Sequence, residues 1–473
     1  MPTLTMKFGG TSVGSAEAIA QAVDIVAGAA HTDRVLVVCS AMGGVTNLLI
    51  EGAQTAAAGD GARYQAIAHA LRQKHEAAIR ALLSSDVERI AIHDEVEALI
   101  EEFETLCYGI YVLREASPKA MDKVSSLGER MCVPIVSARL RQCGVPSYSI
   151  SASRLIITDD QFQNAGVLFE ESEAVVRREL LPLLDQGLVP VVTGFIGATR
   201  DGVVTTLGRG GSDYSAALLG AYVDSAEVWI WTDVDGVMTT DPRLAPDAQV
   251  IPVLSYGEVG EMAYFGAKVL HAKTVQPLVE RNIPVHVKNT FNPTAEGTLI
   301  TREEHAAPGT VKAVTAIRDV SLVTVAGRGM IGVPGIAART FSAVAKRQAN
   351  VLMIAQSSSE QSICFVVPEA KSREVVAAIK TELEIEFGRQ DIDRAWADDN
   401  VEIITVVGVG MLRQHGVAAR VFGALGEAGV NIIAIVHGAS DYCVSMVVRT
   451  DDTERAVRAI HKLVVLNGGA AAR

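Results

Sequence analysis

The sequence predicts an α/β protein in which one layered α/β/α domain precedes two smaller ferredoxin-like modules of the β-α-β-β-α-β type. Three observations support this fold class. Strand patterns alternate with helical patterns from Met1 to about Arg302, Gly-rich loops follow several of these strands, and an internal repeat lies beyond Lys312. The length of 473 residues exceeds what one hydrophobic core can organise.

The first predicted element is a short strand over 4–8 that runs directly into a glycine pair. Lys7 lies near the end of this strand, Gly9 and Gly10 let the backbone approach a ligand, and Ser15 is the expected N-cap of the next helix. An ammonium group, backbone N–H groups and a helix N-terminus then converge, which suits an oligophosphate. The spacing differs from G-x-x-x-x-G-K-[ST], which excludes a P-loop, and an ordinary tight turn is the alternative.

Residues 35–38 and 188–192 are continuous apolar runs, typical of central parallel strands. Loops follow both runs, and the first loop, 40–47, offers backbone amides and the Thr46 hydroxyl where ligands of open α/β sheets bind. Between the two strands, 61–115 is Ala-rich, charged and helical in period. We therefore predict a helical subdomain there, with mostly solvated charges.

Two further loops carry charged residues beside glycines. Glu129 follows a glycine at an expected helix start, where an acid that only complements the helix dipole is the structural alternative to a binding role. Residues 208–213, G-R-G-G-S-D, surround Arg209 with glycines and open a helix. A guanidinium in that position can grip a carboxylate through two hydrogen bonds, and a turn with a surface arginine is the alternative.

The strand predicted over 228–231 is followed by T-D-V-D-G at 232–236 and by D-P-R at 241–243. This D-x-D-G lacks the spacing and the terminal Glu of a calcium loop, so a nucleotide pocket is the better interpretation. Lys268, within F-G-A-K-V, adds a second ammonium group, for which a surface lysine is the alternative.

Residues 324–354 align without gaps onto 405–435, at a constant offset of 81 and with thirteen identities. Two copies indicate a duplicated module rather than a solenoid. Each copy reads strand, Gly-rich loop, amphipathic helix, strand, turn, strand, helix, and the charged stretch 389–400 is expected to separate the copies. Residues 327–332 fit G-x-G-x-x-G, but no acidic residue lies about 20 positions further on, which argues against a dinucleotide site.

The chain carries 42 Lys and Arg against 55 Asp and Glu, a net charge of −13, which argues against binding of nucleic acid or of an anionic membrane. The six scattered cysteines form no C-x-x-C pair and fit reduced thiols in a cytoplasm. We expect neither a signal peptide nor a membrane span, since the first residues lack an apolar core and no window of 18 residues is continuously apolar.

Five motifs precede the repeated modules in the order K-F-G-G-T-S-V, S-L-G-E, L-G-R-G-G-S-D-Y, W-T-D-V-D-G-V and F-G-A-K-V-L-H. Together they resemble the aspartokinases, members of the amino-acid kinase family with two C-terminal ACT domains, over almost the whole chain. The resemblance implies a catalytic domain over 1–302, a linker over 303–314, and ACT domains over 315–388 and 401–473 that either follow one another or interleave.

The resemblance also implies roles for individual residues. The groups acting in catalysis would be Lys7, Asp213 and Lys268, with Asp213 orienting both lysines. Aspartate would be bound by Thr46, Ser212, Glu129 through its ammonium group and Arg209 through its α-carboxylate. The nucleotide would contact Lys7, Gly9, Gly10, Thr232, Asp233, Met238, Arg243, Lys268 and Val269, although many relatives carry a tyrosine near the position of Met238. An amino-acid effector would contact Met330, Gly335, Asn350, Ser357 and Asn431.

The implied activity is transfer of a phosphoryl group from ATP to the β-carboxylate of L-aspartate, the first step toward lysine, threonine and methionine. Mg²⁺ would bridge the phosphates, with no metal held by protein ligands alone. The ACT domains imply feedback regulation by an amino acid, for which lysine, threonine, both together or neither are compatible with the sequence, and a homodimer or homotetramer. The alternatives are another carboxylate kinase of the same fold and an inactive amino-acid sensor, which the presence of Lys7, Asp213 and Lys268 disfavours. We do not expect a fused homoserine dehydrogenase at this length.

Overall fold

The computed structural model describes residues 1–266, 270, 272–304, 311–438 and 440–468. The chain divides into two compact units, which are described separately. The first comprises Met1–Val237, Val250–Tyr256 and Leu270–Glu303, and the second comprises Met238–Gln249, Gly257–Val269 and Glu304–Arg473. Residues 238–249 and 257–269, which the sequence prediction placed in the first domain, thus cluster with the second unit.

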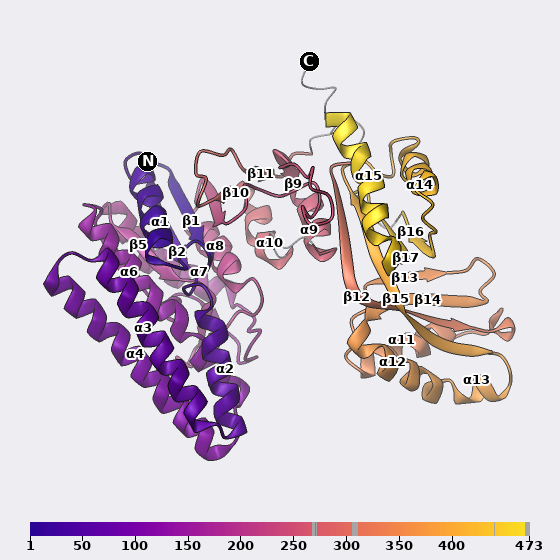
Figure 1. The fold of residues 1–473 in the computed structure, drawn as a ribbon, viewed down its shortest axis with the longest axis horizontal. Coiled ribbons are helices and arrows are strands. Elements are labelled where there is room, and N and C mark those ends of the chain that lie inside the picture. Colours follow the sequence, from indigo (N-terminus) through magenta and orange to yellow (C-terminus); the bar gives the residue numbers. More distant parts are fainter. Residues whose placement is uncertain (267–269, 271, 305–310, 439, 469–473) are drawn as a thin grey trace. The chain divides into compact units, whose positions relative to one another are not determined.

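An eight-stranded sheet forms the middle layer of the described part of the first unit (Figure 1). The strands lie in the order β3, β5, β2, β1, β8, β10, β11 and β9. From β3 to β10 they run parallel, whereas β11 is antiparallel to β10 and parallel to β9. Their bounds are β1 Thr3–Phe8, β2 Arg34–Cys39, β3 Ser147–Ile150, β5 Val189–Thr193, β8 Glu227–Thr232, β9 Val253–Ser255, β10 Val285–Asn289 and β11 Thr298–Thr301.

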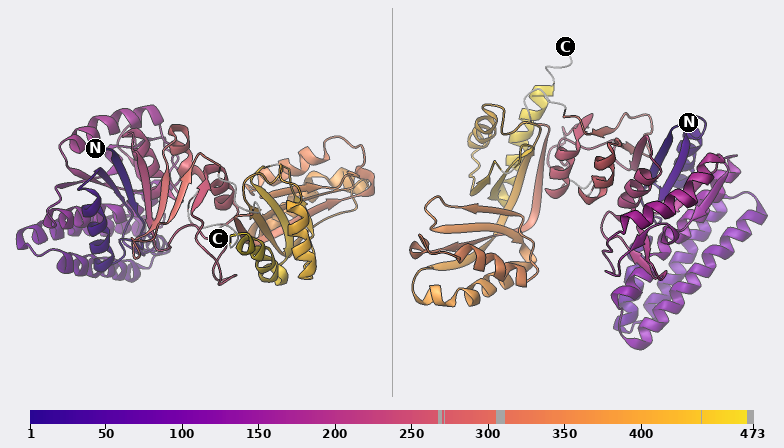
Figure 2. Two further views of the ribbon diagram at one scale, coloured as in Figure 1. Left: turned by 90° about the horizontal axis from the view of Figure 1, so that it is seen from above. Right: turned by 180° about the vertical axis from the view of Figure 1, so that it is seen from behind.

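Helices cover both faces of this sheet. Helices α1 and α6 pack on one face with α2, α3 and α4 outside them, and α7 and α8 pack on the other face with α10 against α8 (Figures 1 and 2). The bounds are α1 Ala16–Ala29, α2 Val45–Ala58, α3 Gly61–Leu82, α4 Asp86–Leu113, α5 Pro118–Ser125, α6 Leu127–Gln142, α7 Phe169–Asp185, α8 Gly211–Tyr222 and α10 Ala272–Arg281. Helix α9, Tyr256–Tyr264, belongs to the second unit from Gly257 onward. A smaller sheet joins β4 Ile157–Thr158, β6 Ile196–Thr199 and β7 Val204–Thr206.

The elements predicted around the first glycine pair are confirmed. All six residues of β1 are buried, as expected of a central strand, and Phe8 stacks on Trp231 of β8 with ring centroids 6.0 Å apart. Ser15 is the N-cap of α1, and its side chain accepts a hydrogen bond from the Ala18 N–H at 3.3 Å. The predicted parallel strands over 35–38 and 188–192 are also present as β2 and β5.

Helices α3 and α4 occupy the region predicted to be helical and pack with α2. The aromatic ring of Phe103 lies against Gly52 of α2, where an added Cβ would come within 2.4 Å of the ring. A glycine at that position therefore lets the two helices approach closely. This packing extends the hydrophobic core that begins at β1 and β2.

The second unit is built on a six-stranded sheet within the described residues, in the order β13, β14, β12, β15, β17 and β16. The strands are β12 Ala313–Ala326, β13 Met353–Gln356, β14 Ser362–Pro368, β15 Arg394–Val407, β16 Ala434–Val436 and β17 Cys443–Arg449. The helices are α11 Ile336–Lys346, α12 Glu369–Glu382, α13 Glu384–Gly388, α14 Val417–Glu427 and α15 Thr453–Gly468.

The two repeated modules interleave, because β12 and β15 each serve both of them. Residues 320–326 of β12 pair with β14 and with the first half of β15, which completes the first module. Residues 313–317 pair instead with 403–407 of β15. The second module therefore takes one of its strands from the segment that precedes the first module in the chain. A register shift between Ile317 and Val320, with Asp319 at φ 57°, separates the two halves of β12.

One prediction about this region is wrong. The stretch 389–400 was expected to separate the modules, but 394–400 forms the first half of β15. The charges misled the prediction because their side chains lie on exposed parts of the strand, where Arg394 covers the Trp396 ring at 3.9 Å. The predicted linker 303–314 also extends too far, because β12 already begins at Ala313. Residues 305–310 of this linker lie outside the described part of the chain.

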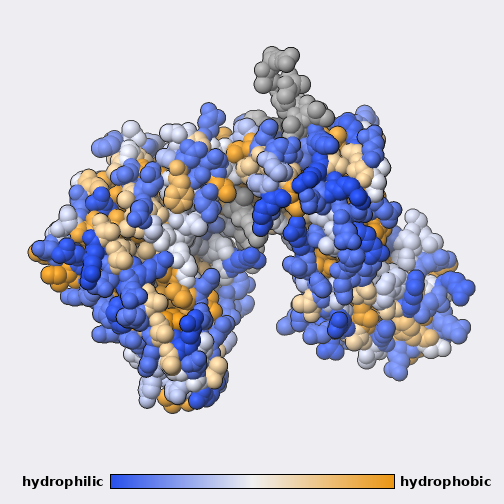
Figure 3. Space-filling model, viewed as in Figure 1, coloured by the Kyte–Doolittle hydropathy of each residue, from blue (hydrophilic) through white to orange (hydrophobic). Residues whose placement is uncertain are grey.

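Hydrophilic residues predominate on the face of the molecule drawn in Figure 3, with hydrophobic residues scattered among them. Across the described residues, no helix combines the length and apolar character that crossing a membrane requires. All six cysteines belong to the described part of the chain, and each is a free thiol.

Candidate active site

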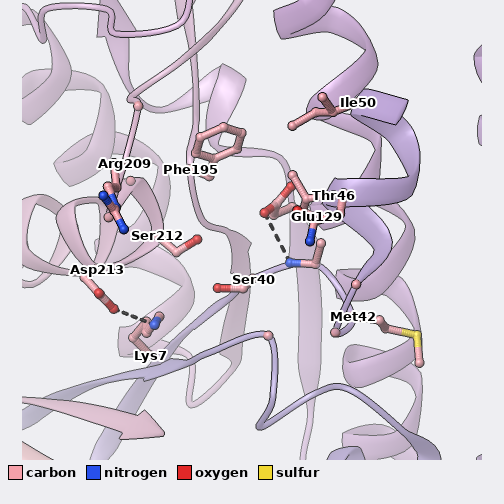
Figure 4. A pocket seen from close by; sticks show the side chains of 18 residues that line it. Lys7, Ser40, Met42, Thr46, Ile50, Glu129, Phe195, Arg209, Ser212 and Asp213 are labelled. Carbon is pink, nitrogen blue, oxygen red and sulfur yellow. Dashed lines mark hydrogen bonds and ion pairs between the residues drawn. The ribbon is translucent and has the colours of Figure 1, made fainter. Parts of the chain in front are cut away.

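A pocket of about 590 Å³ lies at the carboxyl ends of β1, β2 and β5 in the first unit (Figure 4). The sequence predicted a ligand site at this edge, because the carboxyl ends of parallel strands meet there. The predicted site residues that line it are Lys7, Gly10, Thr46, Glu129, Arg209, Ser212 and Asp213. The other lining residues are Ser40, Ala41, Met42, Gly43, Gly44, Asn47, Ile50, Phe195, Gly208, Gly210 and Gly211.

Close backbone packing between two glycine-containing loops forms one wall of the pocket. A Cβ added to Gly10 would lie 3.3 Å from the Ala41 carbonyl oxygen, and one added to Gly43 would lie 3.2 Å from the Gly10 carbonyl oxygen. Side chains at these positions would push the loops apart. The Gly9 N–H donates to the Trp231 carbonyl at 3.1 Å, and Gly9 is not among the described residues that line the pocket, so its nucleotide contact stays a prediction.

Lys7 and Asp213 form an ion pair at the pocket. Their Nζ and Oδ1 atoms lie 2.5 Å apart, and Lys7 is only 8 % exposed. The pair joins the central strand β1 to the first turn of α8, so the ammonium group is held in one place while it faces the pocket. This contact agrees with the predicted role of Asp213 in orienting Lys7, whereas Lys268 lies outside the described residues.

Glu129 is a buried carboxylate in the first turn of α6. Its Oε1 accepts a hydrogen bond from the Ala41 N–H at 3.2 Å, while Oε2 is buried and has no hydrogen-bond partner among the described residues. Burial raises the pKa of Glu129 to about 8, against the opposing effect of the Glu129 and Ala41 N–H groups. A buried carboxylate with one unpaired oxygen at a pocket wall suits a cationic group of a ligand.

Arg209 lies between two glycines in the left-handed region, Gly208 at φ 76° and Gly210 at φ 73°. The residue is exposed, and its side chain forms no hydrogen bond or ion pair with the described part of the chain. The guanidinium is therefore available to an anionic ligand. Figure 4 shows Arg209 and Ser212 on the side of the pocket opposite Glu129 and Thr46.

Thr46 and Ser212 lie in the first turns of α2 and α8. The N-caps of these helices are Gly44 and Gly210, and neither makes a side-chain capping hydrogen bond. First-turn N–H groups are therefore left without a side-chain acceptor beside the pocket, where the positive end of each helix dipole favours an anion.

The structure brings only part of the predicted nucleotide set to this pocket. Thr232 ends β8 in the first unit, and its hydroxyl lies 3.2 Å from Asp233 Oδ1. Met238 and Arg243 belong to the second unit, where Arg243 is exposed and pairs with Asp241 at 2.6 Å. Val269, like Lys268, lies outside the described residues.

The predicted effector residues lie in the two ACT-like modules. Gly335, at φ 91°, is the N-cap of α11, and the Ser357 hydroxyl accepts a hydrogen bond from the Ser362 N–H at 3.1 Å. Asn350 and Asn431 are exposed and stand three residues before β13 and β16, respectively. Met330 is 4 % exposed, and its side chain packs in the hydrophobic core of the first module.

Sequence reasoning missed Phe195, which lines the pocket at φ 68°. A left-handed conformation is strained for a bulky residue, and two hydrogen bonds hold it: the Phe195 N–H donates to the Ser215 hydroxyl, and its carbonyl accepts from the Leu207 N–H. The Thr193-Gly194 end of the apolar run was the available signal, since it marks a loop at the correct edge of the sheet.

Comparisons with known proteins agree with this fold. Residues 2–289 match the model of the Amino acid kinase family, and residues 323–383 and 404–463 each match an ACT domain. The maize protein named bifunctional aspartokinase/homoserine dehydrogenase 1 is 35 % identical over 98 % of this chain and 50 % of its own length. The chain spans about half the length of the bifunctional relatives that it matches.

Two crystal structures of E. coli aspartokinase III are similar over 98 % of this chain. The structure in complex with aspartate and ADP has a TM-score of 0.82 and 31 % identity and is covered over 100 % of its chain. The structure in complex with lysine and aspartate has a TM-score of 0.77 and 32 % identity and is covered over 99 %.

The layered sheet, the lysine at a Gly-rich loop and the paired ACT modules are the features of an amino acid kinase domain joined to ACT domains. This chain belongs to the amino acid kinase family and, within it, to the aspartokinases.

Proposed function

We propose that the chain transfers the γ-phosphoryl group of ATP to the β-carboxylate of L-aspartate, giving 4-phospho-L-aspartate and ADP. The observation that carries the proposal is the pocket itself, which combines Lys7 with the buried Glu129 carboxylate and with the Arg209 guanidinium, which has no partner among the described residues. These groups complement a phosphate, an α-ammonium and an α-carboxylate, respectively. The E. coli relative crystallised with aspartate and ADP supports the same substrates.

The residues suit a carboxylate as the attacking group. A β-carboxylate is ionised at neutral pH, so its oxygen needs no general base. It needs relief from the repulsion between two anions that approach one another. The Lys7 ammonium and the first turns of α2 and α8 supply positive potential there, and charge stabilisation with positioning accounts for most of phosphoryl-transfer catalysis.

Mg²⁺ fits this proposal as an ion carried by the phosphates of the nucleotide. The described residues contain no cluster of three or more His, Cys, Asp or Glu side chains that could hold a metal ion. A magnesium ion bound mainly by phosphates and water needs no such cage. Its chemistry would be to neutralise charge between the β- and γ-phosphates.

The substrate assignment is tested by an ATP-coupled assay with aspartate and with glutamate, on the unaltered chain and on Arg209→Ala. We expect aspartate to be the better substrate, because Arg209 and Glu129 fix both α-groups and thereby the reach of the side-chain carboxylate. Arg209→Ala should raise KM for aspartate by about 100-fold, the cost of one charge-assisted contact. An unchanged KM would show that another group holds the α-carboxylate, and turnover with glutamate alone would support another carboxylate kinase instead.

A regulatory function follows from the interleaved modules. We propose that lysine or threonine binds near Gly335 and Asn350 of the first module and inhibits by favouring one of two arrangements of the protein. The support is the exposed carboxamide of Asn350, the left-handed N-cap of α11 and the lysine complex of the E. coli relative. The same modules are the proposed contact of a homodimer or homotetramer.

Isothermal titration calorimetry on the full chain tests the effector site. We expect lysine or threonine to bind, and Asn350→Ala to weaken that binding by about tenfold through loss of one hydrogen-bonding side chain. Asn400→Ala, at an exposed asparagine of β15 outside the proposed effector site, is the control and should bind as the unaltered chain does. Absence of binding by both amino acids, together with a monomeric mass in solution, would contradict the regulatory proposal and leave the kinase proposal standing.

A further inference from the structure

Asp122 is a buried carboxylate that does not line the pocket. It lies in α5, is 1 % exposed and accepts hydrogen bonds from three donors. The Gln163 N–H lies 2.9 and 3.0 Å from its two oxygens, the Thr206 N–H lies 3.0 Å from Oδ2, and the Thr206 hydroxyl lies 2.8 Å from Oδ1. One side chain thus joins α5, the segment between β4 and α7 at residue 163, and the end of β7.

Both segments that Asp122 holds lead to the Arg209 loop. Thr206 is the last residue of β7 and stands three positions before Arg209. Gln163 packs closely against Gly208, because a Cβ added to Gly208 would lie 3.1 Å from the Gln163 carbonyl oxygen. The Thr206 carbonyl accepts from the Ala165 N–H at 3.0 Å, which closes the connection between the two segments.

Arg209 depends on these backbone anchors for its position. Its own side chain makes no hydrogen bond or ion pair with the described residues. On its carboxyl side, the Gly211 N–H donates to the Gly208 carbonyl at 3.0 Å, where α8 begins. On its amino side, the anchor is Thr206 held by Asp122.

Asp122 is also connected to Glu129 on the other side of the pocket. The Asp122 carbonyl accepts a hydrogen bond from the Ser126 N–H at 3.0 Å, at the junction of α5 and α6. Glu129 follows in the first turn of α6. A short path of hydrogen bonds and helix backbone therefore runs from Glu129 through Asp122 to the loop that presents Arg209.

We propose that Asp122 is a positioning residue that sets the separation of Glu129 and Arg209 and thereby determines which amino acid the pocket accepts. The inference rests on the proposed function, in which these two groups bind the α-ammonium and the α-carboxylate. Holding both α-groups at a fixed separation determines how far the substrate side chain reaches toward the phosphoryl group. A looser Arg209 loop would bind aspartate less tightly and discriminate less against glutamate, whose side chain is one methylene longer.

The test is steady-state kinetics of Asp122→Asn with aspartate, glutamate and ATP. The amide presents N–H donors where the carboxylate oxygens accept, so the Thr206 contacts are disrupted with little change in volume. We expect KM for aspartate to rise by about tenfold, the preference for aspartate over glutamate to fall by a similar factor, and KM for ATP to stay within about twofold. Asp185→Asn, at an exposed aspartate paired with Arg34, is the matched control and should behave as the unaltered chain.

A second pair of variants keeps the inference testable if Asp122→Asn does not fold. Thr206→Val removes the hydroxyl that donates to Asp122, whereas Thr206→Ser retains it. We expect Thr206→Val to raise KM for aspartate selectively by about threefold to fivefold, and Thr206→Ser to restore the unaltered value. Equal changes in KM for ATP and aspartate, or lowered thermal stability with an unchanged preference for aspartate, would overturn the positioning role. Failure of the proposed function would differ, because the unaltered chain would then not turn over aspartate.

Discussion

Replacing Lys7 by alanine is expected to lower kcat by about 10³-fold, in the range found when one preorganised charge-stabilising group is removed. Lys7 is held by Asp213 at 2.5 Å beside the pocket, so its ammonium group needs no reorganisation during the reaction. In the proposed reaction, the variant would lose the share of charge stabilisation between the β-carboxylate and the phosphoryl oxygens that Lys7 supplies. Single-turnover measurements with saturating ATP and aspartate would separate this loss from weaker binding.

The fold should survive the Lys7 substitution, with one complication. Removal of the ammonium group leaves the Asp213 carboxylate partly buried without its partner, which is a destabilising arrangement. The double variant Lys7→Ala/Asp213→Asn removes both charges and should recover stability but not kcat. Circular dichroism monitors the fold, and Lys371→Ala, at an exposed lysine paired with Glu374, is the control. Near-normal kcat in Lys7→Ala would remove Lys7 from the mechanism.

The second large effect concerns Glu129 and pH. Burial raises the pKa of this carboxyl to about 8, so it is mostly protonated in the empty pocket at pH 6 and ionised above pH 8. In the proposed complex, only the ionised form would pair with the ammonium group of aspartate. KM for aspartate should therefore fall by up to about tenfold per pH unit between pH 6 and 8, while KM for ATP stays nearly constant.

Glu129→Gln should raise KM for aspartate by about 100-fold at pH 8 and abolish its dependence on pH, because a neutral amide replaces the buried partner of a charge. Glu171→Gln, at an exposed glutamate paired with Arg200, should leave both properties unchanged. A pH-independent KM in the unaltered chain would exclude Glu129 as the group that binds the ammonium.

The raised pKa of Glu129 also predicts that the stability of the folded chain decreases as pH rises. The folded-state pKa of about 8 exceeds the ordinary value of 4.5, so the folded state binds the proton more tightly than the unfolded state. The contribution of Glu129 to stability is fully present below about pH 4.5 and is lost as pH rises through about 8. Thermal unfolding should thus find Glu129→Gln more stable than the unaltered chain at pH 8.5, and similar to it near pH 5.

Much of the catalytic unit could be predicted from sequence because its signals are local. Continuous apolar runs identified β1, β2 and β5, and glycines directly after them identified the loops at one edge of the sheet. The pocket accordingly contains Lys7, Thr46, Glu129, Arg209 and Asp213, as predicted. Phe195 escaped prediction because nothing in the neighbouring residues indicates a left-handed phenylalanine; contacts from α8 and Leu207 hold it there.

By itself, the sequence determined the α/β class, the glycine loops and the duplication over 324–354 and 405–435, since each depends on residue type and spacing along the chain. Only the tertiary structure decided that residues 313–317 complete the second module, that 394–400 is a strand, and that Asp122 holds the end of β7. Strand pairing and the burial of a charge are settled between segments far apart in the chain. Neither the choice of partner strand nor the pKa of Glu129 can therefore be predicted from the residues that neighbour it in the sequence.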